Sequence, residues 1–135
     1  MRYLLDTSAL IRLHRRQVDP VWDGLLKRGL LTLCEPVLAE TLMIADTKSY
    51  AQMEEDLRES CVWAAVPDDI WPLVAAIRRE LVPHSAHKGL SVADLVVVAT
   101  AIRLKLEVLH EDGDFETVAR FVPELRQRRI SAGPA

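Results

Sequence analysis

Five acidic residues from four separate parts of the chain are the first candidates for chemistry: Asp6, Glu40, Asp94, Asp112 and Asp114. No cluster of His or Cys residues accompanies them in the sequence. Carboxylate oxygens without nitrogen or sulfur ligands are the donors that hold a hard divalent cation, Mg²⁺ or Mn²⁺. If the fold brings these acids together, the sequence predicts such a metal site.

Each of these acids also has an ordinary structural explanation. Asp6 and Asp114 could cap the helices predicted to follow them, and Glu40 could be a solvated helix residue. Asp94 stands three residues after Ser91, which is the spacing of a capping box. Because crowded carboxylates repel one another unless a positive charge neutralises them, convergence of all the acids favours a functional site.

Ser8, two residues after Asp6, is a candidate accessory residue. Its hydroxyl could orient a metal ligand or a water molecule, as groups behind the ligands of a metal commonly do. It could equally cap the first helix. The sequence leaves both interpretations open.

Short apolar strands alternate with helices along the whole chain. Strands are predicted at residues 2–5, 30–34, 62–66, 106–109 and 125–130. Helices are predicted at residues 7–16, 20–29, 36–44, 49–60, 68–81, 91–102 and 115–121, with a polar loop at 83–89. This alternation predicts an α/β fold: a doubly wound, mainly parallel sheet of about five strands flanked by helices in three layers, as in flavodoxin-like folds. The last strand carries Arg126, Arg128 and Arg129, which is typical of a protected edge strand.

In a doubly wound sheet, ligands bind at the carboxyl ends of the strands, where the strand order reverses. Asp6 directly follows the first predicted strand, and Asp112 and Asp114 follow the fourth. Glu40 and Asp94 lie near the starts of helices that begin at the same edge. We therefore expect four chain segments to bring their acids to one edge, where a carboxylate not engaged by metal could accept a proton.

The length and charge of the chain limit its class. At 135 residues it fits one domain, placed at residues 1–130, with residues 131–135 as a C-terminal tail. The net charge of −3 argues against simple electrostatic wrapping of nucleic acid. If the five candidate acids are neutralised at a metal, however, the remaining residues carry a net charge of +2. No apolar stretch could cross a bilayer and no signal-peptide core is seen, so a cytoplasmic protein without a membrane partner is expected. Cys34 and Cys61 follow no metal-ligand spacing and are predicted to be reduced.

Four segments, in their order along the chain, resemble a known family. They are LLDTSAL around Asp6, EPVLAE around Glu40, SVADLVVVATA around Asp94 and VLHEDGDFETVA around Asp112. They are similar to the PIN domain and, more closely, to the VapC-type toxins of bacterial toxin–antitoxin pairs. The resemblance implies a Mg²⁺- or Mn²⁺-dependent endoribonuclease, in which a metal-activated water hydrolyses an RNA phosphodiester.

The resemblance also implies roles by position. The catalytic acidic quartet corresponds to Asp6, Glu40, Asp94 and Asp112. Asp6, Asp94, Asp112 and Asp114 would be metal ligands, Asp114 as an accessory acid beside the quartet. His110 stands where many PIN domains carry a threonine, although this toxin branch often has histidine there.

The resemblance further implies protein partners. A homodimer is expected, together with a small antitoxin that blocks the site and joins the toxin on its own promoter DNA. Contact with DNA is expected only through the antitoxin. The apolar residues that could contribute to an antitoxin groove, if they are exposed and not part of the core, are Leu10, Leu13, Trp22, Leu42 and Tyr50.

Basic residues that could hold RNA lie in two places. Arg12 and Arg15 are on the first predicted helix, and His84, His87 and Lys88 are in the loop that leads to the long apolar helix. Phosphate contacts of this kind would position RNA without reading its sequence. The alternative for each is an exposed basic residue that only keeps the surface soluble.

Two other acidic-pocket folds do not fit. A response-regulator receiver domain needs an Asp after the third strand and a Lys after the last, but the third strand ends in Val66-Pro67 and no lysine follows Lys105. A haloacid-dehalogenase-like phosphatase needs Asp-x-Asp after the first strand, and Asp6-Thr7-Ser8 lacks the second acid. A metal-dependent DNA nuclease and a non-catalytic antitoxin-binding protein with a vestigial site remain open.

Overall fold

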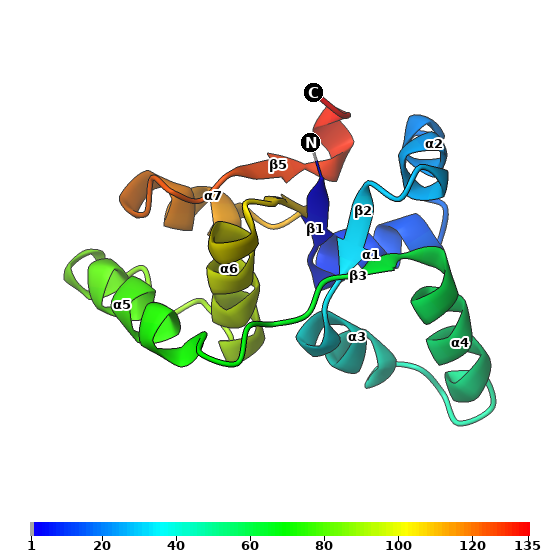
Figure 1. The fold of residues 1–135 in the computed structure, drawn as a ribbon, viewed down its shortest axis with the longest axis horizontal. Helices are drawn as coiled ribbons and strands as arrows, with labels where there is room; N and C mark the ends of the chain where they lie inside the picture. The colour runs from blue at the N-terminus through cyan, green and yellow to red at the C-terminus, as the bar shows by residue number, and fades with distance from the viewer. Residues whose placement is uncertain (1) are drawn as a thin grey trace.

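The computed structural model describes residues 2–135, and a five-stranded sheet lies at its centre (Figure 1). The strands are β1 (Tyr3–Leu5), β2 (Leu31–Leu33), β3 (Val62–Trp63), β4 (Glu107–His110) and β5 (Gln127–Arg129). Their order is β3-β2-β1-β4-β5, and every pairing is parallel. The parallel α/β fold predicted from the sequence is confirmed, and β5 is an edge strand as expected.

Helices surround this sheet on both sides of the strands in Figure 1. They are α1 (Thr7–His14), α2 (Val21–Lys27), α3 (Glu35–Leu42), α4 (Tyr50–Ser60), α5 (Trp71–Leu81), α6 (Val92–Leu104) and α7 (Gly113–Phe121), with short 3₁₀ turns η1 (Val82–His84) and η2 (Ile130–Ala132). None of the helices in residues 2–135 is long and apolar enough to pass through a lipid bilayer.

Most element boundaries differ from the sequence prediction by one to three residues, among them those of the third strand, the last helix and the loop before α6. The third strand ends at Trp63 and not at Val66, because β2 ends at Leu33 and offers no partner beyond it. The last helix begins at Gly113 and not at Phe115, because Asp112 caps it. The predicted polar loop at 83–89 begins with the 3₁₀ turn η1.

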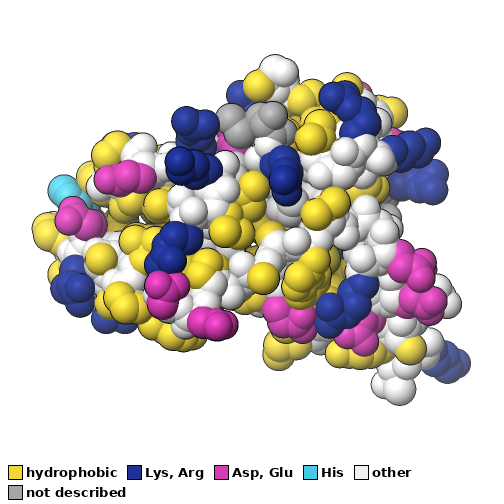
Figure 2. All heavy atoms as spheres, in the orientation of Figure 1, with side chains coloured by type: hydrophobic (Ala, Val, Ile, Leu, Met, Phe, Trp, Pro, Cys, Tyr) yellow, Lys and Arg dark blue, Asp and Glu magenta, His cyan; other side chains and the backbone are white. Residues whose placement is uncertain are grey.

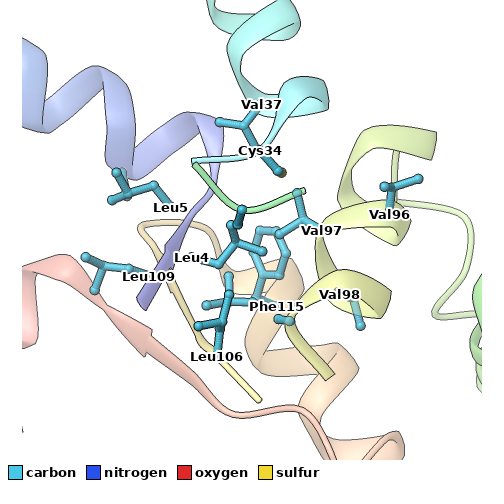
Figure 3. Close-up of a cluster of buried hydrophobic side chains, with 14 of the residues drawn as sticks. Leu4, Leu5, Cys34, Val37, Val96, Val97, Val98, Leu106, Leu109 and Phe115 are labelled. Atoms are coloured by element: carbon cyan, nitrogen blue, oxygen red, sulfur yellow. The ribbon is translucent and has the colours of Figure 1, made fainter. Parts of the chain in front are cut away.

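Helix α6 is the central buried element. Its residues from Leu95 to Ala101 are all buried, as its nearly continuous apolar sequence predicts. Figure 3 shows Val97 beside Leu4 of β1 and Phe115 of α7, in the cluster that fixes α6 against the sheet. Burying one such side chain contributes about 1.5–3 kcal/mol. The first turn of α6, which carries Asp94, is therefore held on a rigid element.

The apolar residues considered for an antitoxin groove mostly belong to the core. Leu10, Trp22 and Leu42 are buried, and Leu13 packs partly buried against them. Tyr50 is exposed at the start of α4. Only Leu13 and Tyr50 of this set therefore present surface to a partner.

The strand order reverses between β1 and β4. The chain runs outward from β1 through β2 to β3, then returns to place β4 on the other side of β1 and β5 beyond it. Asp6 follows β1, and Asp112 follows β4 after one intervening residue. The backbone N–H of Asp6 donates to the carbonyl of Leu109 at 3.0 Å, which joins the two strand ends. This edge is where ligands bind in open α/β sheets.

Candidate active site

Asp6 is both a helix cap and a buried carboxylate. Its side chain is 4% exposed, and Oδ1 accepts the N–H of Ala9 at 2.8 Å as the N-cap of α1. Burial raises the pKa of Asp6 to about 6, although hydrogen bonds from Ala9 and Ser8 oppose the rise. An acid that only capped a helix would not need to be buried in this way, because caps work at the surface.

Ser8 connects the ends of two strands. Its hydroxyl donates to the carboxylate of Asp6 at 2.8 Å and accepts the N–H of Glu111 at 2.9 Å. The first helix is capped by Asp6, so the interpretation of Ser8 as the cap is wrong. Ser8 instead fixes the Asp6 carboxylate relative to the turn after β4, a position consistent with the accessory role predicted for it.

Asp94 caps its own helix, and the charges of two other acids act on its carboxylate. It completes a capping box with Ser91: its N–H donates to the Ser91 hydroxyl at 3.0 Å, and its Oδ2 accepts the Ser91 N–H at 3.2 Å. Partial burial raises the pKa of Asp94, and the negative charges of Glu40 and Asp112 raise it further. The capping explanation is therefore correct for this residue, and the charges of Glu40 and Asp112 on its carboxylate support the convergence that the sequence predicts.

Glu40 lies on α3 and is half-buried. The hydroxyl of Thr7, the residue after Asp6, donates to Oε1 of Glu40 in a short hydrogen bond. The sequence analysis did not single out Thr7. The signal available was its position next to an acid at a strand end, where a hydroxyl can reach a carboxylate from another segment.

Asp112 and Asp114 occupy the turn after β4. Oδ1 of Asp112 accepts the N–H of Asp114 at 2.9 Å and so caps α7. Burial raises the pKa of Asp114, and the charge of Asp112 adds to the rise. A Cβ atom on Gly89 would lie 3.6 Å from Oδ1 of Asp114, so the loop before α6 runs beside this acid.

Among the residues that the structure describes, the candidate acids form no ion pair with a basic side chain. The ion pairs within residues 2–135 use other acids, and none involves Asp6, Glu40, Asp94, Asp112 or Asp114. In the acidic turn, Arg129 binds Glu111 at 3.0 Å and Glu116 at 2.6 Å. The sequence analysis missed this role of Arg129 and treated it only as edge protection, since nothing in the strand itself indicates its partners.

The chemistry of these acids fits a hard cation. Oxygen is their only donor atom, and the negative charges that act on Asp94 and Asp114 from neighbouring acids are not met by a salt bridge from the described part of the chain. As they stand, no three His, Cys, Asp or Glu side chains within residues 2–135 have an arrangement that could hold a metal ion. Carboxylate side chains would have to turn toward a cation, so Mg²⁺ or Mn²⁺ at this site stays a prediction.

The predicted RNA-binding residues lie in different environments. Arg15 and Lys88 are exposed, and half-buried Arg12 donates from Nη1 to the carbonyl of Ser8 at 3.3 Å. His84 is exposed and stacks on the ring of Phe121, with centroids 3.8 Å apart. On the face drawn in Figure 2, Lys and Arg side chains form several separate groups among acidic and apolar ones.

His87 differs from the other basic candidates because it is half-buried. Its Nδ1 is shielded from solvent and has no hydrogen-bond partner among residues 2–135. It lies two residues before Gly89, whose backbone runs beside Asp114. His87 and Lys88 are therefore next to a backbone segment that lies beside Asp114, while Arg12 binds the carbonyl of Ser8 near Asp6.

The sequence matches the family model of the PIN domain over residues 3–121. The chain belongs to the PIN-domain family. Ribonuclease VapC21 of Mycobacterium tuberculosis is 28% identical over 135 residues, which cover 99% of this chain and 98% of the relative. Ribonuclease VapC6 of the same organism is 33% identical over 98 residues, which cover 72% of this chain and 77% of the relative.

Solved structures share the fold of this PIN domain. The crystal structure of DNA-bound VapBC from Salmonella typhimurium matches with a TM-score of 0.76 at 15% identity, covering 96% of this chain and 98% of the other. The structure of VapBC2 from Rickettsia felis, bound to a DNA fragment from its promoter, matches with a TM-score of 0.72 at 19% identity over the same shares. At these identities the likeness establishes the fold.

Proposed function

We propose that this PIN domain is the toxin of a toxin–antitoxin pair and acts as a metal-dependent endoribonuclease. The observation that carries the proposal is the placement of Asp94 at the first turn of α6, where the charges of Glu40 and Asp112 from two other segments act on its carboxylate and raise its pKa. The relatives called ribonuclease VapC support RNA as the substrate. The cytoplasm is the compartment in which we expect this reaction.

The acids divide into two roles in this proposal. Asp6, Asp94 and Asp112 would hold Mg²⁺ or Mn²⁺, with Asp114 beside them. When bound, such a cation lowers the pKa of a water molecule and offsets charge on the phosphate oxygens. Glu40 is the group that accepts the proton of the attacking water. Thr7 holds the Glu40 carboxylate through Oε1, which orients Oε2 for that task.

Basic residues around the acids position the RNA. His87 and Lys88 lie in the loop whose Gly89 runs beside Asp114, so they are placed to bind phosphates next to the scissile one. Arg12 and Arg15 on α1, and His84 at the start of the same loop, would extend this contact along the strand. Because such contacts are to the backbone, they add affinity and leave sequence preference to other groups.

An antitoxin and a second copy of the chain complete the proposal. A hollow of about 390 Å³ between α1, α2 and α4 is lined by Leu13, Leu26 and Leu57 among polar and charged residues, and it suits an amphipathic antitoxin helix. A second, more apolar hollow of about 540 Å³ lies beside Glu40 and is bordered by exposed Trp71. Exposed apolar surface of this kind is typical of an association face, and we assign it to the homodimer.

Cleavage of total cellular RNA by the purified, antitoxin-free protein tests the proposed activity. Mg²⁺, Mn²⁺ and EDTA are compared, and the parent is run beside Asp94→Asn. Asp69→Asn is the matched control, because Asp69 is an exposed acid paired with Arg103 outside the site. Discrete fragments that disappear with EDTA and with Asp94→Asn, but not with Asp69→Asn, are expected.

The same assay separates the remaining alternatives. Metal-dependent cleavage of a DNA substrate, without cleavage of RNA, would overturn the ribonuclease proposal in favour of a DNA nuclease. A folded protein that cuts neither nucleic acid with any metal would favour a non-catalytic antitoxin-binding protein.

A further inference from the structure

His110, at the end of β4, is a buried histidine with two defined hydrogen-bond partners. Its side chain is 0% exposed. The backbone N–H of Asp112 donates to its Nδ1 at 3.0 Å, and its Nε2 lies 2.7 Å from Oε1 of Gln127 on β5. Phe115 packs against the ring with the centroids 5.2 Å apart. The imidazole is therefore held on three sides by the turn, the edge strand and α7.

These partners determine which ring nitrogen carries the proton. A backbone N–H can only donate, so Nδ1 must be the unprotonated nitrogen. Nε2 then carries the hydrogen and donates it to Oε1 of Gln127. If the tautomer were reversed, two N–H groups would face each other between His110 and Asp112 in a buried place. The acceptor on Gln127 selects the tautomer that can bind Asp112.

We propose that His110 and Gln127 form a positioning pair for Asp112. Asp112 would be a metal ligand, so this inference rests on the proposed function. The pair fixes the backbone of Asp112, and the Asp112 side chain in turn caps α7 through the N–H of Asp114. The edge strand β5 thus reaches the candidate site through the buried histidine, although Gln127 itself has no direct contact with the carboxylates in the hydrogen bonds of residues 2–135.

Three variants test the pair. Gln127→Met keeps the length of the side chain and removes the acceptor, so both tautomers of His110 become accessible. In His110→Asn, the side-chain oxygen of Asn can still accept the backbone N–H of Asp112, two residues onward. Unlike histidine, Asn has no tautomers between which Gln127 could select. The double variant shows whether Gln127 acts through the histidine.

The first readouts need neither metal nor RNA. ¹⁵N NMR of the His110 ring, at a pH above about 7.5 where histidine is ordinarily neutral, reports the tautomer. Hydrogen exchange of the Asp112 amide reports its hydrogen bond. We expect a protonated Nε2 and a protected Asp112 amide in the parent protein. Protection should fall in Gln127→Met and remain in both variants that carry His110→Asn.

Calorimetry with Mn²⁺ measures whether loss of the His110–Gln127 pair weakens metal binding at the site. Loss of a group behind a metal ligand commonly lowers affinity about 10–100-fold, so Gln127→Met should weaken Mn²⁺ binding by about tenfold in the His110 background. In the His110→Asn background the same change should have no effect beyond about twofold, because no tautomer has to be selected.

Several results would overturn the inference. A parent His110 ring protonated on Nδ1 would do so at once, even if Gln127→Met failed to fold. Equal losses of Mn²⁺ affinity from Gln127→Met in both backgrounds would show that Gln127 acts on the strand and not through the ring. If the tautomer and the amide protection are as expected but no RNA is cut, the proposed function fails and the pairing of His110 with Gln127 stands.

Discussion

Replacing Asp6 by Asn should stabilise the folded protein while abolishing the proposed activity. Burial raises the pKa of Asp6 from 3.8 to about 6, which means that the charged form is unfavourable where it lies. Asn removes the charge and keeps the helix cap, because its oxygen can still accept the N–H of Ala9 and Asn and Asp are similar as N-cap residues. The main difference between the two proteins is therefore the buried charge.

The size of the effect follows from the pKa. At about 1.4 kcal/mol for each pKa unit, a rise from 3.8 to about 6 corresponds to about 3 kcal/mol. Between these two pH values the folded state binds the proton more readily than the unfolded state, so stability falls as the pH rises through this window. The penalty is complete above about pH 6 and absent below the ordinary pKa of 3.8. The Asn variant should lack it at every pH.

Urea unfolding in the presence of EDTA measures this difference. Above the pKa of Asp6, Asp6→Asn should have the higher free energy of unfolding, by up to about 3 kcal/mol. The advantage should shrink as the pH is lowered toward 4. Asp6→Ala is the matched control, because it also removes the charge but loses the cap acceptor, at a cost of about 1 kcal/mol. It should therefore gain less than the Asn variant.

Addition of Mg²⁺ provides the second half of the test. A cation bound only by the folded state stabilises it in proportion to the logarithm of its concentration. Mg²⁺ should therefore raise the stability of the parent and leave Asp6→Asn nearly unchanged. The reasoning would be refuted by an Asn variant that is no more stable than the parent at neutral pH, or by an advantage that does not depend on pH.

Three further predictions follow from other contacts. Alanine at both His87 and Lys88 should weaken RNA binding more than it slows the single-turnover rate at saturating RNA; a large loss of that rate would assign the loop to catalysis. Ser91→Ala removes the acceptor for the Asp94 N–H and should lower the free energy of unfolding by about 1 kcal/mol in urea titrations, and an unchanged midpoint would contradict the cap. Arg129→Met removes the cation that pairs with both Glu111 and Glu116, so it should cause a small loss of thermal stability. This loss should shrink at high salt, and a loss independent of salt would point to packing.

The fold and the positions of the acids could be predicted because their signals are local. The apolar residues of α6 and the Ser91–Asp94 spacing identify a capped, buried helix within a single segment. An acid directly after an apolar strand must lie at a carboxyl end of the sheet, whichever order the strands take. This is why Asp6 and Asp112 could be placed at one edge before the strand order was known.

The contacts that hold those acids could not be predicted in the same way. Gln127 lies 17 residues from His110, and Arg129 lies 18 from Glu111. These pairs depend on the register of β4 with β5, in which Arg129 stands opposite His110. A basic edge strand has the same composition whether its side chains face solvent or bind a neighbouring turn. Composition alone therefore predicted protection of the edge and missed its role at the turn.

The charges at the site explain why capping alone is an insufficient account of the acids. The hydroxyl groups of Thr7 and Ser8 donate to the carboxylates of Glu40 and Asp6, and the backbone N–H of Ser91 donates to that of Asp94. All three donors are neutral. Arg129, which binds at the acidic turn, pairs with Glu111 and Glu116 and not with a candidate acid. Neutral partners orient a carboxylate without bringing a full positive charge, and the pKa values of Asp6 and Asp94 stay raised because burial outweighs these hydrogen bonds. Caps could be supplied by serine or asparagine without a buried charge. A cation from outside the chain is the partner that would make this choice of residues favourable.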